Sequence, residues 1–314
     1  MPSLDDSVSA ALSIEGDVLR YAELERRDDG VRLLRCGEHR CSFDLTRSLL
    51  GEDAPPEHTR RVEEVLGAKF DDTSARDLRV TVHPPDSYSF FTPISSEAPV
   101  RDRKRQLLQQ AALVTGVRST KRLHMTSETV RTTQDSEGNP FMWVHVLAVP
   151  DVVDERMAEI VQGLPFREHT WMVSSEAASR VTGRLERAGG SAQEALRPYT
   201  LAVGQYPTHT EYALSRNREW YHAHYAEETE SIDNRAYFAV GFLNRVDVPL
   251  DGVGRLFVYG VDVDPEAYAP FARLFGQEPE RLDPFRVVED RTDGPPTAPS
   301  AFAPCIGAGI GDYL

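Results

Sequence analysis

Apolar and polar residues alternate along the N-terminal part of the chain with the period of two that is typical of half-buried strands. Turns at Glu15-Gly16-Asp17 and at Asp28-Asp29-Gly30 interrupt this alternation, and the second is a strong hairpin signal. The pattern predicts an antiparallel meander of three strands, followed by a helix and a fourth strand. In chain order these elements are Val8 to Glu15, Val18 to Arg27, Val31 to Phe43, Glu57 to Lys69 and Leu78 to His83.

The segment from about residue 84 to residue 150 has a different pattern, in which short strands accompany one amphipathic helix. Its apolar positions predict a small α+β insertion. The predicted elements are a strand from Tyr88 to Ile94, a helix from Ala98 to Gly116, and strands from Leu123 to Thr133 and Phe141 to Val149. The first unit then continues with a helix from Asp151 to Leu164, a strand from Glu168 to Val173 and a helix from Ser174 to about Ala188.

Small residues at Ala188-Gly189-Gly190-Ser191 form the best internal boundary, and the pattern of the first unit restarts after them. The restarted elements are strands at Tyr199 to Gly204, Thr210 to Ser215 and Trp220 to Tyr225, a helix from about Glu227 to Asn244 and a strand from Arg255 to Tyr259. A helix from Pro265 to Phe275, an extended segment from Arg281 to Val288 and a helix from Ala301 to Gly311 follow.

The order strand–strand–strand–helix–strand therefore occurs twice. Such a duplication predicts an α/β fold of two lobes with a cleft between them. We assign residues 1–190 to an N-terminal lobe, with the insertion at about 84–150, and residues 191–314 to a C-terminal lobe.

Composition narrows the possible functions. The 314 residues carry 35 Lys and Arg against 50 Asp and Glu, a formal net charge of −15. This acidity argues against a nucleic-acid binder and against broad adhesion to an anionic membrane, because both need a basic face. We expect no signal peptide, no transmembrane segment and, with only three cysteines, no disulfide framework. These features predict a cytoplasmic protein.

Four short stretches stand at matching places in the duplicated pattern. They are Ser13-Ile14-Glu15-Gly16-Asp17, Leu201-Ala202-Val203-Gly204, Leu256-Phe257-Val258-Tyr259-Gly260 and Pro304-Cys305-Ile306-Gly307-Ala308-Gly309-Ile310. In order and spacing they resemble the phosphate, adenosine and closing-helix motifs of the actin-like ATPase family, and within it the PilM-type proteins of type IV pilus assembly. The resemblance covers nearly the whole chain. It implies an actin-like fold, built from a duplicated ribonuclease-H-like unit.

The sequence differs from this family at the positions that would bind the metal, the attacking water and the phosphates. The resemblance implies an aspartate in each hairpin that helps to place the metal and the attacking water, but Ser13 and Ala202 stand at these positions. Glu15 replaces a glycine that lets phosphate approach closely, and so adds a negative charge beside a polyanion. Arg20 stands for a lysine, and Pro207 removes a donor from the second phosphate turn.

We therefore expect a pseudo-ATPase with no catalytic residue, no bound metal and no cofactor, Mg-ATP being disfavoured. The vestigial phosphate and adenosine positions are Ser13, Glu15, Gly16, Ala202, Gly204 and Gly260.

The resemblance also implies a partner. PilM-type proteins are recruited to the inner membrane by the short cytoplasmic segment of a bitopic protein resembling PilN. The leading hypothesis is a non-catalytic scaffold of a pilus or secretion platform that binds such a segment in the groove beside the inserted subdomain. Alternatives are a nucleotide-dependent switch with an atypical site, a sugar-kinase-like enzyme, and the same fold with an unrelated partner. Oligomeric state stays open.

Three other groups of residues are candidate sites. Cys36, His39 and Cys41 offer metal-ligand atoms within a short stretch, although a strand edge explains them more simply. His222 and His224 place two imidazoles on one face of a strand, which packing also explains. The basic cluster from Arg101 to Arg105 is either a solvated helix start or a docking patch.

Overall fold

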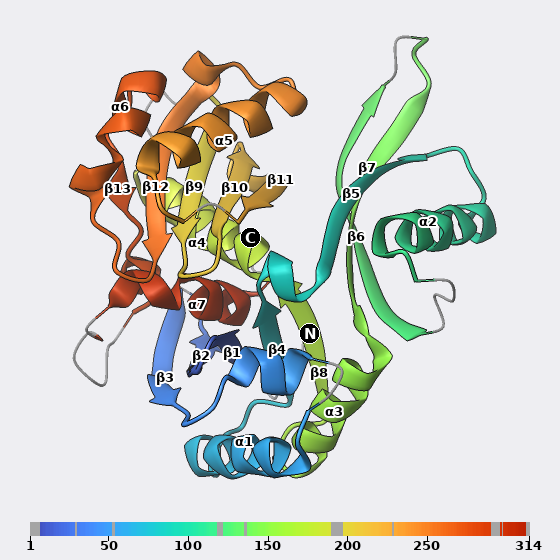
Figure 1. The fold of residues 1–314 in the computed structure, drawn as a ribbon, viewed down its shortest axis with the longest axis vertical. Coiled ribbons are helices and arrows are strands. Elements are labelled where there is room, and N and C mark those ends of the chain that lie inside the picture. The colour runs from blue at the N-terminus through green and yellow to red at the C-terminus, as the bar shows by residue number, and fades with distance from the viewer. Residues whose placement is uncertain are drawn as a thin grey trace.

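The computed structural model describes residues 7–28, 30–51, 54–117, 122–134, 137–189, 197–227, 229–289, 296 and 298–311 (Figure 1). Its N-terminal lobe is built on a five-stranded mixed sheet of order β3-β2-β1-β4-β8. The strands are β1 (Val8–Glu15), β2 (Val18–Arg26), β3 (Val31–Arg40), β4 (Asp77–Val82) and β8 (Glu168–Val173). The helices of this lobe are α1 (Pro56–Lys69), α3 (Asp151–Gln162) and α4 (Ser174–Gly189).

The C-terminal lobe repeats this plan with a second five-stranded sheet of order β11-β10-β9-β12-β13. Its strands are β9 (Tyr199–Gln205), β10 (Thr210–Arg216), β11 (Glu219–Ala226), β12 (Val253–Gly260) and β13 (Glu280–Arg281). Helices α5 (Ile232–Arg245) and α6 (Ala269–Phe275) cover one face of it (Figure 1). In both sheets an antiparallel meander is extended by parallel strands, so the predicted duplication is confirmed.

The inserted subdomain is a three-stranded antiparallel sheet of order β5-β7-β6 with one helix. It comprises β5 (Tyr88–Ser95), α2 (Val100–Thr115), β6 (Leu123–Gln134) and β7 (Pro140–Pro150). Figure 1 shows it standing to one side of the two lobes, with α2 on its outer face. This agrees with the α+β insertion that the sequence predicts.

The two lobes share an apolar core between their sheets. Helix α4 and the last helix, α7 (Ala303–Ile310), lie in this layer (Figure 1). Residues of β1 and β2, of α4 and α7, and of β9 and β12 form one buried cluster there. The backbones of the two helices approach closely at Gly307, where a Cβ atom would collide with the carbonyl of Ala177. A larger residue at position 307 would therefore push α4 and α7 apart.

Most predicted elements are present, although several bounds differ; for example, the predicted helix from Pro265 to Phe275 begins with a 3₁₀ turn over Pro265–Tyr268. Helix α5 begins at Ile232 rather than near Glu227, because the side chain of Ser231 accepts the Asn234 N–H and caps the helix at that point. The predicted extended segment from Arg281 to Val288 is wrong in part. Pro284–Val287 form a 3₁₀ turn, which the Asp283 side chain caps by accepting the N–H of Phe285.

The predicted boundary at Ala188-Gly189-Gly190-Ser191 starts at the end of α4, but its residues 190 and 191 lie outside the described residues, so the boundary stays a prediction. Among the helices of the described ranges, none has the length and apolar character to cross a bilayer.

Candidate functional site

The β1–β2 hairpin holds the first group of vestigial phosphate positions. Ser13 pairs with Arg20 across the hairpin, so both side chains leave the same face of the sheet. The Glu15 carboxylate lies 2.7 Å from Arg20 Nη1, and their side chains are only 12% and 7% exposed. Gly16 forms the turn, where its N–H donates to Thr46 Oγ1 at 2.9 Å. The hairpin therefore carries a buried ion pair of its own.

The second hairpin, between β9 and β10, holds the other positions. Ala202 and Gly204 are buried in β9. Gly204 lies between Glu211 on β10 and Tyr259 on β12 in the strand register. Because Gly204 has no side chain, the Tyr259 ring lies over it, and Tyr259 Oη donates to Glu211 Oε2 at 2.8 Å. Gly204 therefore makes room for the contact between Tyr259 and Glu211.

Gly260, the vestigial adenosine-loop position, ends β12. Its φ of 105° lies in the region that favours glycine, and a Cβ there would collide with the carbonyl of Gln205. Its own carbonyl accepts the Ser300 hydroxyl at 3.1 Å. The loop is thus closed by contacts within the chain.

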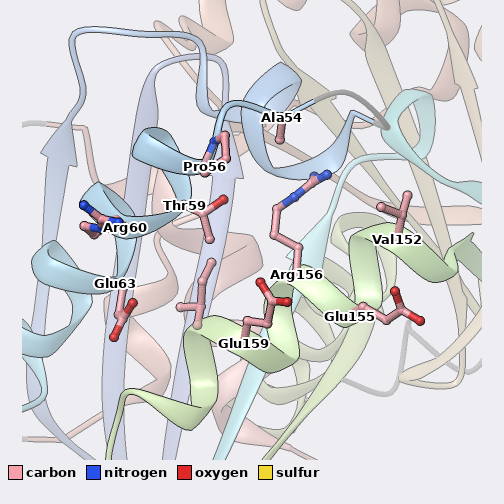
Figure 2. Close-up of a pocket in the computed structure, with 10 residues that line it drawn as sticks. Ala54, Pro56, Thr59, Arg60, Glu63, Val152, Glu155, Arg156 and Glu159 are labelled. Atoms are coloured by element: carbon pink, nitrogen blue, oxygen red, sulfur yellow. The ribbon is translucent and has the colours of Figure 1, made fainter.

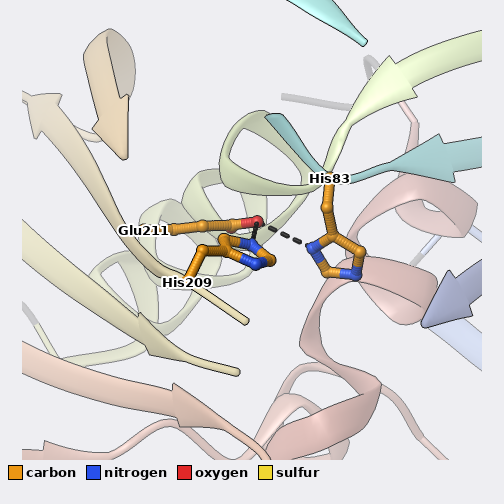
Figure 3. A group of neighbouring side chains, drawn as sticks. All are labelled: His83, His209 and Glu211. Atoms are coloured by element: carbon orange, nitrogen blue, oxygen red, sulfur yellow. Dashed lines mark hydrogen bonds and ion pairs between the residues drawn. The ribbon is translucent and has the colours of Figure 1, made fainter. Parts of the chain in front are cut away.

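A buried cluster of His83, His209 and Glu211 joins the two lobes (Figure 3); we call it the interlobe cluster. His83 follows β4 in the N-terminal lobe, whereas His209 and Glu211 lie at the start of β10 in the C-terminal lobe. His83 Nδ1 lies 2.7 Å and His209 Nε2 3.0 Å from the same oxygen, Glu211 Oε1. The histidines are 2% exposed and the glutamate is fully buried.

Further contacts complete the surroundings of Glu211. The Ser174 hydroxyl, at the start of α4, donates to Oε1 at 2.5 Å. Burial alone would raise the pKa of Glu211, but the hydrogen bonds and charges of His209 and His83 hold it well below its usual range. Burial likewise opposes a charged His83, yet the Glu211 carboxylate outweighs it and the pKa of His83 is raised. Each partner therefore favours the charged form of the other.

Tyr206 fills the space beside this cluster. Its ring stacks on His209 at a centroid distance of 4.9 Å and meets His83 edge-on at 4.4 Å. Burial, and then the charges of Glu211 and Glu15, raise the pKa of Tyr206 well above its ordinary value. Tyr206 is 3% exposed.

A magnesium nucleotide in this fold would need its phosphates between the two hairpins. Backbone N–H groups would have to line a space that solvent and ligand enter. The described residues of these hairpins include the Glu15–Arg20 pair and the Tyr206 ring, which are nearly inaccessible to solvent. The Glu15 carboxylate would also repel a phosphate. Glu15 is therefore a poor neighbour for a nucleotide phosphate.

The structure separates the other candidate metal ligands. Cys36 packs against the interlobe core, whereas Cys41 is buried in the core on the opposite face of the sheet. His222 stacks on Phe91 at a centroid distance of 4.0 Å, and His224 packs near Phe242 at 5.8 Å. His222 is thus part of an aromatic contact between the inserted subdomain and β11, whereas the ring contacts of His224 lie within the C-terminal lobe.

The basic cluster at the start of α2 is partly paired. Arg105 lies 3.0 Å from the Asp102 carboxylate, and Arg103 Nε donates to the carbonyl of Ala98. Arg101 and Lys104 are exposed. No contact in the described residues links this cluster to the two hairpins.

A groove runs along β6, where the inserted subdomain faces β8 and α4. It consists of two hollows of about 420 and 330 Å³ that share Glu128, Glu176 and Arg180. Thr126 and Ser127 of β6 line its first part, together with Trp171 of β8. This β6 groove corresponds to the predicted groove beside the insertion.

Another hollow, of about 350 Å³, lies between α1 and α3 (Figure 2). Its lining mixes apolar residues with Arg60, Glu63, Glu155, Arg156 and Glu159. Arg156 Nη1 donates to the backbone carbonyls of Leu49 and Gly51, so its role is to hold the preceding turn in place. The packing of α1 against α3 accounts for this hollow, and we assign no binding site to it.

Sequence reasoning missed the interlobe cluster altogether. Two signals could have revealed it. His209 and Glu211 are separated by one residue, which places both on one face of a strand. Glu211 also directly precedes the apolar run Tyr212-Ala213-Leu214 of the same strand, and a charge buried in such a strand needs a partner.

Comparisons with known proteins define the fold. No protein-family model matches the sequence, and no curated protein matches it. A chain in the structure of the PilM–PilN type IV pilus biogenesis complex superposes with a TM-score of 0.65 at 13% identity, over 96% of this chain and 97% of that chain. A Bacteroides thetaiotaomicron protein with an actin-like ATPase fold and unknown function gives a TM-score of 0.54 at 10% identity, over 91% and 93%.

The chain therefore has the actin-like ATPase fold, as the sequence motifs indicate. Its structure is similar to the PilM–PilN complex chain over nearly its full length.

Proposed function

We propose that the protein is a non-catalytic scaffold of the PilM type. The observation that supports this most is the Glu15–Arg20 pair of the first hairpin, which puts a nearly buried carboxylate where the family resemblance implies a glycine beside phosphate. The absence of an aspartate at Ser13 and Ala202 points the same way, because the metal and the attacking water would lack their carboxylates.

The partner in this proposal is the short cytoplasmic segment of an inner-membrane protein resembling PilN. The similarity to the PilM–PilN structure supports this choice, and the β6 groove is a suitable place for an extended segment. The protein would then be cytoplasmic and held at the membrane through its partner.

The pseudo-ATPase part is tested by nucleotide titration. A ligand at about a hundred times its Kd stabilises a protein by about 2.7 kcal/mol, which is a shift of several degrees. We expect no such shift of Tm with millimolar ATP or ADP and Mg²⁺, and no heat of binding in calorimetry. A nucleotide-binding protein of the same fold is measured in parallel as the positive control. Micromolar binding of ATP would overturn this part.

The scaffold part is tested with a synthetic peptide of the PilN-like protein's cytoplasmic segment from the same organism. Thr126→Trp places a large ring in the β6 groove, whereas Thr132→Trp makes the same change at another exposed position of the strand, outside the groove. We expect the first change to weaken peptide binding at least tenfold and the second to leave it unchanged. No binding by the wild type, or equal loss in both variants, would contradict the assignment.

A further inference from the structure

The interlobe cluster brings together the ligand atoms of a metal site. His83 Nδ1, His209 Nε2 and Glu211 Oε1 all lie within 4.8 Å of one another. Figure 3 shows both imidazole rings directed at the same carboxylate oxygen. We propose that His83, His209 and Glu211 bind a divalent transition metal such as Zn²⁺, and that this ion fastens the two lobes together.

The ligand set requires a small movement of the carboxylate. Zinc bonds to histidine nitrogen and carboxylate oxygen are about 2.0–2.2 Å long, whereas the two nitrogens are 2.7 and 3.0 Å from Glu211 Oε1 and point at it. An ion bound to these nitrogens would therefore take the present place of this oxygen, and the Glu211 carboxylate would turn aside by about an ångström to bind it. The Ser174 hydroxyl, 2.5 Å from the same oxygen, would then be left near the ion.

The outer contacts are those that orient metal ligands. A ligating histidine is usually held by a hydrogen bond at its other ring nitrogen, and a ligating carboxylate by one at its other oxygen. His209 Nδ1 lies 3.0 Å from Thr208 Oγ1, and Glu211 Oε2 accepts the Tyr259 hydroxyl. Both ligands of the C-terminal lobe are thus held at their other polar atom before any ion binds.

The charge and type of the ligands select the ion. Two imidazole nitrogens and one carboxylate suit Zn²⁺ and its first-row neighbours, whereas Mg²⁺ prefers oxygen ligands and retained water. An ion here would be a structural cross-link between lobes, unrelated to the magnesium of a nucleotide.

The test uses the full chain, stripped with EDTA and titrated with Zn²⁺ by calorimetry, and with Co²⁺ by its visible absorption. We expect one ion per chain with a Kd of about a micromolar or below, and a rise in Tm on binding. His209→Ala leaves the His83–Glu211 pair in place, and we expect it to lower the affinity at least tenfold.

The matched control is His169→Ala. It removes an imidazole from another histidine–carboxylate group, in which His124 and His169 contact opposite oxygens of Asp154 at 3.0 and 2.8 Å. Binding should be unchanged in this variant. The proposal is overturned if the wild type binds no stoichiometric ion, if His209→Ala binds it as tightly, or if His169→Ala loses it. In each case the interlobe cluster is a hydrogen-bonded contact only.

Discussion

Two buried groups of histidines join parts of this molecule, and they differ in one component. The interlobe cluster surrounds the carboxylate of Glu211. The second group, which we call the aromatic cluster, consists of His145 and His222 packed with Phe91 and Trp220, where the inserted subdomain meets β11. Among the described residues, no hydrogen bond or ion pair joins a carboxylate to His145 or His222.

The missing carboxylate changes the direction in which the histidine pKa shifts. Burial lowers the pKa of His145 to about 3 and that of His222 to about 4, so both rings are neutral at pH 7. In the interlobe cluster burial acts in the same direction, but Glu211 outweighs it and the pKa of His83 is raised. A single buried carboxylate thus accounts for the opposite shift of a buried histidine.

The largest expected effect comes from Glu211→Gln. This change keeps the shape of the side chain but leaves His83 either charged without a counter-ion or obliged to lose its proton. Breaking one partner of a buried ion pair costs about 3–5 kcal/mol. Urea unfolding at pH 7 in the presence of EDTA measures the loss. Exposed Glu219→Gln serves as the control and should change stability by less than about 0.5 kcal/mol.

A substitution can add a carboxylate to the aromatic cluster, which lacks one. Ser89 Oγ lies 2.9 Å from His145 Nε2, so Ser89→Asp places a carboxylate at this ring. We expect the pKa of His145 to rise by about two pH units or more, equivalent to about 2.7 kcal/mol between its two protonation states. An NMR titration of the imidazole measures it. The neutral variant Ser89→Asn is the control, and equal titration of both variants would refute the comparison.

Acidification should weaken the aromatic cluster. His222 has a pKa of about 4 in the folded protein, against about 6.5 when unfolded. The unfolded chain therefore binds more protons below pH 6.5, and stability falls as the pH drops towards the folded value. For His222→Phe we expect the loss between pH 7 and pH 5 to be smaller than in the wild type by about 1–2 kcal/mol. Parallel pH profiles of the two proteins would contradict this.

Much of the fold could be predicted because its signals are local. The bounds of β1 and β8 agree with the predicted strands, since turn residues and a period of two mark them. The repeated order of these elements along the sequence then predicted the duplicated fold. The 3₁₀ turn at Pro284–Val287 was missed, because its apolar residues show no period that distinguishes a short turn from an extended segment.

The candidate site could not be predicted in the same way. His83 and Glu211 are 128 residues apart in the chain, and neither belongs to a motif with a known spacing. Their contact depends on how the lobes pack around α4 and α7. Ser13, Glu15 and Gly16 lie on the β1–β2 hairpin as their strand pattern predicts, but that Glu15 pairs with Arg20 is a fact of the three-dimensional structure.

The smallest expected effect sharpens the comparison within the interlobe cluster itself. His209 Nδ1 has the Thr208 hydroxyl as a partner at 3.0 Å, whereas His83 Nε2 has no hydrogen-bond partner among the described residues. Thr208→Val removes the hydroxyl at nearly constant volume. Because Thr208 is exposed and water can take its place, we expect a loss of about 0.5–1 kcal/mol. Thr208→Ser keeps the hydroxyl and should retain the stability in the same urea experiment with EDTA. A loss as large as that of Glu211→Gln would mean that the orientation of His209, rather than the charge of Glu211, holds the lobes together.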